Sequence, residues 1–410
     1  MNFEYKDYEL SNAITDIAAG PFGSNLKVSC FTTTGFPIID GANLKEITVT
    51  DNITKFVPED KARSLHRSIA KRRDVVVTIS GNVGQVSYIP DNSQYAEYLC
   101  SQRQFRVTFD ESKIYVPYLV YYLHSVEGQS KILAFANQTG VPALSQPLKN
   151  FRKIKIDLPS LAEQKKIAAI LSALDEKIAI NREINDNLEQ QAQALFKSWF
   201  VDFDPYDEIM PSDWINGTVD DLAKEIVCGK TPSTKVSEYY GSDIPFITIP
   251  DMHGKIYTVA TERYLSICGA NSQAKKTLPK NAICVSCIGT AGLVTLVASP
   301  SQTNQQINSI IPKDDFSPYY IYLLMQTLSE VINKLGQSGS TIVNLNKAQF
   351  GKIKVCIPTV TTMKGFDGIV APLFTMILRN QKENICLSSL QETLLPKLMS
   401  GEIDVSAVQL

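Results

Sequence analysis

The stretch at 160–199 constrains the fold most, because no other part of the chain has so regular an apolar repeat. Apolar residues recur at the two positions of a seven-residue repeat that keep a continuous seam along one side of a helix. The seam residues are Ile167, Leu171, Leu174, Ile178, Leu188, Ala192, Leu195 and Trp199, and Asn181 and Asn185 interrupt them. One helix over this stretch is roughly 60 Å long, which suits a spacer that holds two bodies apart.

The start of this helix is also marked. Ser160 and Glu163, directly after Pro159, have the spacing of a capping box. In that motif each side chain accepts a hydrogen bond from the other residue's backbone N–H, which satisfies two donors that lack a partner inside the helix. We therefore expect the helix to begin at this serine.

The same seam recurs near the C-terminus, where Leu373 follows Leu174 by 199 residues. Its residues are Phe366, Val370, Leu373, Ile377, Leu387, Leu394 and Leu398, and Asn380 and Asn384 interrupt it. A buried seam asparagine is tolerated opposite another polar group, so we predict that the two helices pair antiparallel with their asparagine layers in contact. The alternative is that all four asparagines face solvent. Pro372 predicts a kink in the second helix or its true start.

The repeat extends well beyond the helices. The segment QTGVPALSQPLKNFRKIKIDLPS (138–160) matches QSGSTIVNLNKAQFGKIKVCIPT (337–359) at the same offset, and DVVVTISGNVGQV (74–86) matches AICVSCIGTAGLV (282–294). VPYLVYYL (116–123) likewise matches SPYYIYLL (317–324). Short Val/Ile-rich runs that end at glycine predict strands, and 117–133 predicts a helix. The chain is therefore a mixed α/β globular unit followed by a long helix, present twice.

Composition and charge describe an ordinary globular protein. The 410 residues suit two or three domains, and no leader sequence or membrane-spanning run is evident, so we expect a cytoplasmic protein. The eight cysteines have no regular spacing and suit a reducing compartment. The net charge of −2 hides a segregation, because the globular segments carry a slight basic excess and the helical segments are acidic. Such an excess is weak support for a nucleic-acid partner.

Basic residues gather in two places. Arg63, Arg67 and Lys71 are spaced four apart, which predicts one basic face of a helix, either solvated or in contact with DNA. Near 149–155 a second basic run alternates with Ile154 and Ile156, which predicts a strand with an exposed charged side.

Four segments of the chain resemble the specificity subunit of type I restriction-modification systems: GPFGSNLK (20–27), IDLPSLAEQKKIAAIL (156–171), FKSWFVDFDP (196–205) and LLPKLMSGEIDV (394–405). The resemblance covers almost the whole chain. It departs in the second repeat, which has Met363 where the first has Gln164 and carries Pro372 inside the helix.

The resemblance implies two target-recognition domains, at 1–159 and 211–358, each reading one half of a bipartite site in double-stranded DNA. The helices at 160–203 and 359–404 then form an antiparallel coiled coil that separates them, in a pseudo-two-fold internal repeat. The resemblance further implies that two modification (methyltransferase) subunits dock on the helices and that restriction (motor-nuclease) subunits complete the complex. S-adenosylmethionine, ATP and Mg²⁺ are expected on those partners, with no cofactor on this chain and no membrane partner.

The sequence gives less support to a catalytic function than to DNA recognition. Gly229-Lys230-Thr231 resembles the end of a phosphate-binding loop, but Lys224 stands where the loop needs its first glycine. Cys284 and Cys287 have zinc-ligand spacing, yet the repeat places apolar residues there and favours a buried strand. The three histidines, His66, His124 and His253, have no matched partner in both repeats that would support catalysis.

Two hypotheses follow: a non-catalytic subunit that reads DNA, and a scaffold that joins enzyme subunits without reading DNA. In the first, polar and basic side chains on repeat-matched loops contact phosphates and base edges in the major groove. The candidate side chains of the first half are Lys27, Lys45, Arg63, Arg67, Lys71, Asn82, Gln85 and Gln138. Those of the second half are Lys230, Ser233, Lys235, Lys255, Lys275, Lys276, Gln337, Ser338 and Ser340.

Overall fold

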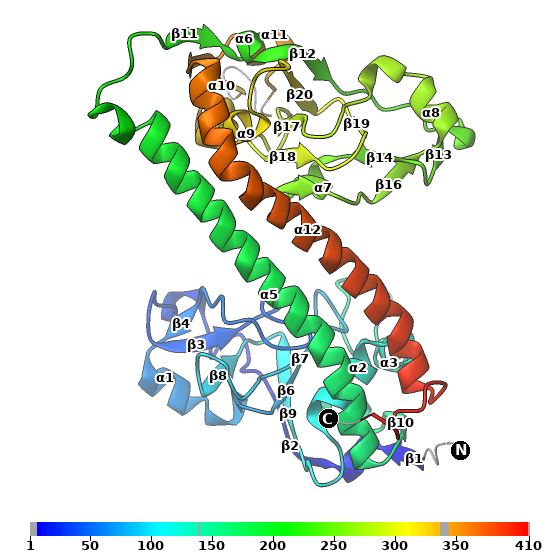
Figure 1. Ribbon diagram of the computed structural model, residues 1–410. Helices are drawn as coiled ribbons and strands as arrows, with labels where there is room; N and C mark the ends of the chain where they lie inside the picture. Colours follow the sequence, from blue (N-terminus) through cyan, green and yellow to red (C-terminus); the bar gives the residue numbers. More distant parts are fainter. Residues whose placement is uncertain (1–5, 138–139, 337–343, 409–410) are drawn as a thin grey trace. The chain divides into compact units, whose positions relative to one another are not determined.

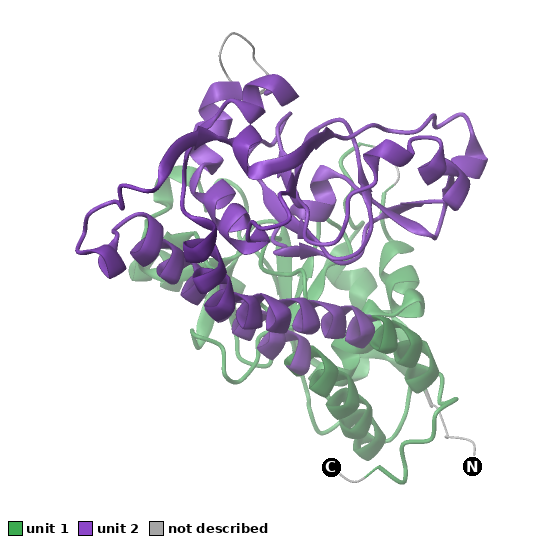
Figure 2. Ribbon diagram, turned by 45° about the horizontal axis from the view of Figure 1, so that its top comes forward, with its two compact units in different colours: residues 1–176, 389–410 green, residues 177–388 purple. Residues whose placement is uncertain are grey.

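The computed structural model describes residues 6–137, 140–336 and 344–408 (Figure 1). The chain divides into two compact units, one formed by residues 1–176 and 389–410 and the other by residues 177–388 (Figure 2). Both long helices, α5 (Leu161–Phe200) and α12 (Val360–Met399), contribute to both units. None of the described helices is long and apolar enough to cross a membrane.

The first unit contains two four-stranded sheets and a two-stranded ribbon. The first sheet has the order β2 (Ile14–Ala19), β9 (Gln104–Phe109), β6 (Val75–Thr78) and β7 (Val86–Tyr88). The second has the order β4 (Phe56–Val57), β3 (Phe36–Ile39), β8 (Glu97–Cys100) and β5 (Ile69–Lys71). In the ribbon, β1 (Lys6–Glu9) pairs with β10 (Lys155–Leu158). The helices are α1 (Glu59–Ser64), α2 (Val116–His124), α3 (Val126–Leu133) and α4 (Pro147–Arg152).

Strand β6 shows why this unit is layered. Side chains alternate between the two faces of a strand. Val75 and Val77 pack into a core with residues of α2, α3 and α5, whereas Val76 packs against Ile39 and Cys100 of the second sheet. The unbroken apolar run is therefore the pattern of a strand that is covered on both faces.

The second unit repeats this architecture. Its larger sheet has the order β12 (Ala223–Cys228), β20 (Ile307–Pro312), β17 (Ile283–Ser286), β18 (Val294–Val297) and β15 (Tyr257–Thr258). The smaller has the order β13 (Tyr240–Gly241), β16 (Arg263–Leu265), β14 (Ile244–Ile247) and β19 (Gln302–Thr303). The ribbon pairs β11 (Ile215–Thr218) with β21 (Lys354–Ile357). The remaining helices are α6 (Val219–Leu222), α7 (Ile249–Met252), α8 (Ile267–Asn271), α9 (Pro318–Thr327), α10 (Ser329–Gly336) and α11 (Lys347–Gly351).

Strand order confirms the repeat that the sequence predicts. β2, β9, β6 and β7 follow the same order as β12, β20, β17 and β18, and a parallel pair occurs at the matching place in both units, β3 with β8 and β14 with β19. The predicted buried strand at Cys284 is β17. Cys284 and Cys287 belong to different core clusters, on either side of the sheet, so their spacing does not bring the two thiols together.

The two long helices pack together, and the seam residues that the sequence predicts are all buried or half-buried. The capping box is present, since Glu163 accepts from the backbone N–H of Ser160 at 2.9 Å and Ser160 accepts from that of Glu163 at 3.4 Å. Figure 1 shows the two helices side by side.

The asparagine layers meet as predicted, which also fixes the antiparallel direction. Asn181 Nδ2 donates to Asn384 Oδ1 at 2.8 Å and to Glu383 Oε2 at 2.9 Å, and Asn380 Nδ2 donates to Asn185 Oδ1 at 2.9 Å. The solvent-facing alternative is wrong, because Asn181, Asn185 and Asn380 are all buried. Paired amides of this kind hold the register of the seam, because sliding one helix along the other leaves each amide opposite an apolar side chain.

We expect Asn185→Leu to destabilise the second unit by about 1–3 kcal/mol, because the buried amide of Asn380 loses its partner. Adding Asn380→Leu restores stability, since both polar groups are then removed together. Denaturant unfolding of the two single variants and the double variant measures the coupling. Asn187→Leu, the same change on the exposed face of α5, is the matched control. Simple additivity of the two single effects contradicts the pairing.

Two sequence predictions about the basic segments are wrong. Arg63, Arg67 and Lys71 do not share a helical face, because α1 ends at Ser64 and the chain turns into β5, which pairs with β8. Burial of Ile69 and Ala70 stabilises that strand. The run at 149–155 is not one strand: α4 ends at Arg152, and only the part from Lys155 belongs to β10.

Two helix boundaries also differ from the prediction. The helix expected over 117–133 is divided at Ser125. Its hydroxyl donates to the carbonyl of Tyr122 in α2 at 2.6 Å and caps α3 by accepting from the backbone N–H of Gly128 at 3.1 Å. The C-terminal helix does not start at Pro372, because α12 begins at Val360, after Thr359, whose Oγ1 accepts from the N–H of Thr362 at 3.2 Å.

Candidate nucleic-acid interface

In both units the loop after the central strand is built on two glycines. The loop that connects β6 to β7 contains Gly81 and Gly84, with φ of +90° and +94°. The matching loop between β17 and β18 contains Gly289 and Gly292, with φ of +78° and +89°. These left-handed conformations are readily adopted by glycine and disfavoured for other residues, so both loops turn at the same two repeat-matched positions.

The turn before the neighbouring strand is bonded to this loop in the same way in both units. The backbone N–H of Ile79 donates to the carbonyl of Arg103 at 2.6 Å, and that of Cys287 donates to the carbonyl of Gln306 at 2.8 Å. A short side chain two residues earlier fixes each turn. Arg103 N–H donates to Ser101 Oγ at 3.4 Å, and Gln306 N–H donates to Asn304 Oδ1 at 3.1 Å.

A third segment starts at Gly20 in the first unit and at Gly229 in the second. A Cβ atom at Gly20 would lie 1.9 Å from the carbonyl oxygen of Ser101, and one at Gly229 would lie 2.1 Å from that of Asn304. Neither position accepts a larger residue without moving the backbone. We call the surface formed by these three segments the rim. It comprises residues 20, 79–84 and 101–103 in the first unit and residues 229, 287–292 and 304–306 in the second.

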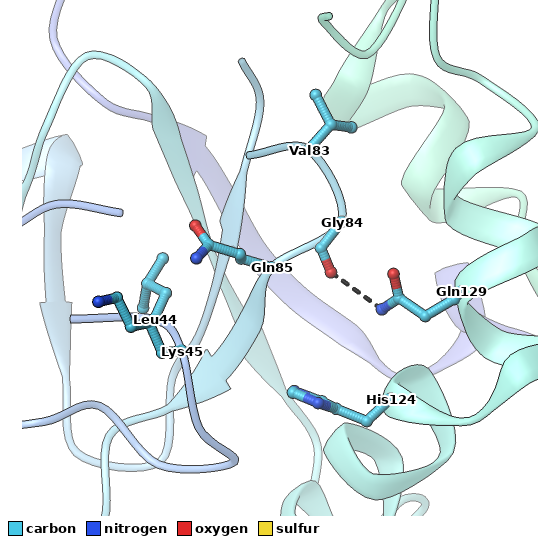
Figure 3. Close-up of a pocket in the computed structure, with 7 residues that line it drawn as sticks. All are labelled: Leu44, Lys45, Val83, Gly84, Gln85, His124 and Gln129. Atoms are coloured by element: carbon cyan, nitrogen blue, oxygen red, sulfur yellow. Dashed lines mark hydrogen bonds between the residues drawn. The ribbon is translucent and has the colours of Figure 1, made fainter. Parts of the chain in front are cut away.

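The first rim contains or adjoins two of the candidates that the sequence predicts. Asn82 is exposed on the glycine loop, and Gln85 follows this loop. Gln85 and Lys45 line an open pocket of about 310 Å³ together with Leu44, Val83, Gly84, His124 and Gln129 (Figure 3). Lys27, also exposed, precedes a short 3₁₀ helix at Val28–Cys30.

Fixed hydrogen bonds shape the wall of this pocket. Gln129 Nε2 donates to the carbonyl of Gly84 at 2.9 Å, which ties α3 to the glycine loop (Figure 3). His124 Nε2 lies 2.6 Å from the carbonyl of Val86 and therefore carries the proton, because a carbonyl oxygen can only accept. Burial lowers the pKa of His124, against the opposing effects of that carbonyl and of the charge of Asp175, so the imidazole is neutral.

The other basic candidates of the first unit lie in a separate place and are largely paired. Arg63 forms ion pairs with Glu59 at 2.8 Å and with Glu97 at 2.5 Å, and Lys71 approaches Glu97 at 3.5 Å. The candidates predicted from the sequence therefore lie on two separate surfaces of the first unit. On the second of these, Arg63 and Lys71 both lie close to the carboxylate of Glu97. Arg67 is exposed on the 3₁₀ helix His66–Ser68 between them in the sequence.

In the second unit, Lys230 follows rim residue Gly229. The backbone carbonyl of Lys230 accepts from Gln273 Nε2 at 2.8 Å, and Lys276 Nζ donates to the carbonyl of Cys228 at 2.9 Å. These two hydrogen bonds hold the segment that contains Lys276 against the segment that contains Lys230. Ser233 and Lys235, which follow Lys230 in the sequence, and Lys275, which precedes Lys276, are exposed. Lys255 is also exposed and follows α7. Gln138, Gln337, Ser338 and Ser340 lie outside the described residues.

Sequence reasoning missed four polar residues of the rims: Gln102, Arg103, Gln305 and Gln306. Gln102, Arg103 and Gln305 are exposed and Gln306 is half-buried. One sequence signal could have identified them: they directly precede strands β9 and β20, which are equivalent in the internal repeat. In the second unit, Gln305 Oε1 also accepts from Thr231 Oγ1 at 2.7 Å, which joins the turn to the segment after Gly229.

The rims offer amides, cations and exposed backbone turns, which can hydrogen-bond to base edges and phosphates. Among the described residues, no group of three or more His, Cys, Asp or Glu side chains is placed to hold a metal ion. The rims therefore carry the kinds of group that hydrogen-bonded recognition uses.

Comparison with known proteins agrees with this chemistry. The family model for the type I restriction modification DNA specificity domain matches residues 31–190 and 211–364. The specificity subunit of the type I restriction enzyme HindI from Haemophilus influenzae is 36% identical over 318 residues, which cover 61% of this chain and 69% of that protein. The MjaIX specificity subunit from Methanocaldococcus jannaschii is 25% identical over 324 residues, covering 75% of this chain and 73% of that protein.

The fold has a solved counterpart. A type I restriction-modification S subunit from M. genitalium superposes with a TM-score of 0.63 at 17% identity, covering 97% of this chain and 96% of that one. Two α/β regions and two long helices that pack together are common to both. With the family model matching both halves of the chain, this protein belongs to the DNA specificity subunits of type I restriction-modification systems, and is itself non-catalytic.

Proposed function

We propose that this chain reads a bipartite DNA target, with one half-site for each rim. The recognition domains are residues 1–159 and 211–358, and the helices at 160–203 and 359–404 are the spacer between them. One observation carries the proposal: the two rims have the same backbone frame and hydrogen bonds but different side chains. A shared frame presents each set of side chains to a duplex in the same way, and the differences then select different sequences.

Phosphate contacts supply most of the affinity in this proposal, and rim side chains supply the sequence preference. Exposed lysines, including Lys27, Lys45 and Lys230, suit the phosphate role because they are free of ion pairs among the described residues. Asn82 and Gln85 suit base readout, since an amide both donates and accepts.

The same proposal assigns the catalytic work to partners. Two modification subunits dock on the two long helices, because the internal repeat offers two related binding places. Restriction subunits complete the assembly, and S-adenosylmethionine, ATP and Mg²⁺ are bound by the partners. Similarity to the HindI protein, a specificity subunit of a type I restriction enzyme, supports an assembly of this kind.

Binding of the assembled complex to DNA tests the proposal. The target is first identified from the methylated sites in DNA of cells that carry the system. We expect the complex to bind a target duplex roughly 10³ to 10⁷ times more tightly than a duplex with both half-sites scrambled. The logarithm of both affinities falls linearly with the logarithm of salt concentration, because phosphate contacts release counterions. Equal affinity for both duplexes at every salt concentration supports a scaffold that does not read DNA.

A charge variant separates the two kinds of contact in this assay. Lys230→Gln lowers the affinity for both duplexes by the same factor and reduces the slope against salt by about one. Lys334→Gln is the control, because Lys334 on α10 is also an exposed lysine but is paired with Glu330.

A further inference from the structure

The side chains of Arg103 and Gln306 occupy equivalent places on the two rims. The Arg103 Nη1 atom lies 3.7 Å from the Cβ position of Gly81, and the Gln306 Nε2 atom lies 3.7 Å from the Cβ position of Gly289. These glycines are matched in the repeat and both have positive φ. In each unit the terminal nitrogen of the side chain therefore lies over the same glycine of the same loop.

The backbone of both residues is fixed by the two hydrogen bonds described above, one from the end of the central strand and one to the side chain of residue 101 or 304. The Cα atom of each residue is therefore held in place, and the two side chains extend from equivalent positions of the two rims. This is the geometry that a readout position requires, since a contact to a base edge depends on a well-held starting point.

Arg103 differs from three other arginines of its unit, which are held by carboxylates. Arg106 is buried against Asp16 at 2.6 Å, Arg73 pairs with Glu111 at 2.5 Å, and Arg63 pairs with Glu97. Arg103 is exposed and has no carboxylate within ion-pair distance among residues 6–137, 140–336 and 344–408. Within the described part of the chain the Arg103 side chain also forms no hydrogen bond, so its N–H donors can serve a partner.

Gln306 is held differently and suits a different base. Its Oε1 accepts from Asn304 Nδ2 at 2.9 Å, which orients the amide. An amide oxygen has a second lone pair, and Nε2 has two donor hydrogens, so both ends of the amide can still contact a ligand.

We propose that Arg103 selects a guanine in the first half-site and that Gln306 selects an adenine at the corresponding place in the second. The guanidinium fork matches the N7 and O6 acceptors of guanine, and an amide matches the N7 acceptor and N6 donor of adenine. The inference rests on the proposed function, since it requires that each rim reads one half-site.

The test measures which sites the assembled methyltransferase complex modifies in a plasmid library with randomised half-sites. Wild-type protein requires a G·C pair at one position of the first half-site. Arg103→Ala accepts any base pair at that position, losing roughly 5- to 150-fold in discrimination. Arg103→Gln shifts the preference there toward A·T. The second half-site stays as in the wild type, which also shows that each variant folds and assembles.

The reciprocal variants act on the other half. Gln306→Ala loses the preference for an A·T pair at one position of the second half-site, and Gln306→Arg shifts it toward G·C. Arg72→Gln is the matched control in the first unit, because Arg72 is exposed but donates to the carbonyl of Ser93 at 3.2 Å, away from the rim. It leaves both half-sites unchanged.

Unchanged base preferences in both Arg103→Gln and Gln306→Arg overturn the assignment of these two residues. That result leaves the proposed function intact if exchange of a whole recognition domain still changes one half-site. If Arg103→Ala does not assemble, Arg103→Gln decides the question, because it keeps a long polar side chain at this position.

Discussion

Exchanging residues 1–159 for the corresponding segment of a relative changes one half of the DNA target and leaves the other half as it was. The expected effect is all-or-none, because the first rim lies entirely within the exchanged segment. The two units also have separate cores: the core clusters of the first unit share no residue with those of the second. A replacement in one unit therefore leaves the frame of the other rim in place.

The design of the exchange follows from contacts inside the first unit. β10, at the end of the segment, pairs with β1 at its start, so the exchange replaces both strands of the ribbon together. The segment also docks on α5, where the backbone N–H of Tyr115 donates to Gln164 Oε1 at 2.8 Å and the hydroxyl of Tyr121 donates to Asp175 at 2.5 Å. A suitable donor keeps a tyrosine at the position of Tyr121.

Mapping of methylated sites in cells that carry the hybrid measures the outcome. The reciprocal exchange of residues 211–358 is the control and changes the opposite half-site. Alteration of both half-sites by a single exchange contradicts the assignment of one rim to one half.

Phe366→Ala destabilises the second unit by about 3–5 kcal/mol, the usual cost of removing a fully buried phenylalanine. The Phe366 ring on α12 has no exposed surface. It packs between the helices, with its centroid 4.9 Å from that of Phe200 and 5.8 Å from that of Trp199, both on α5. Truncation leaves a cavity at the point where the two helices join the core of this unit, which surrounding aromatic rings fill only in part.

Denaturant unfolding followed by tryptophan fluorescence measures the loss, because Trp199 and Trp214 both lie in this core or pack against it. Ile369→Ala on the same helix is the control, since Ile369 is 45% exposed and its removal costs little. Equal effects of the two variants would show that the aromatic contact does not hold the helices to the unit.

Part of this protein can be derived from its sequence because the relevant signals are local or periodic. The two long helices follow from a seam that repeats every few residues, and their antiparallel pairing follows from four asparagines that need polar partners. The capping box and the strand order of the second unit follow in the same way, from short motifs and from the repeat. Candidate residues Asn82 and Gln85 were found because the repeat marks their loop.

Tertiary structure decided the rest, because it depends on contacts between residues far apart in the chain. The helical face expected for Arg63, Arg67 and Lys71 does not form, because pairing of β5 with β8 overrides a spacing that is compatible with a helix. Pro372 lies within α12, where flanking Val370 and Phe374 are buried in the core of the second unit. Arg103 and Gln306 are ordinary polar residues in the sequence. They become equivalent only when two separate strands bring each of them over a matched glycine.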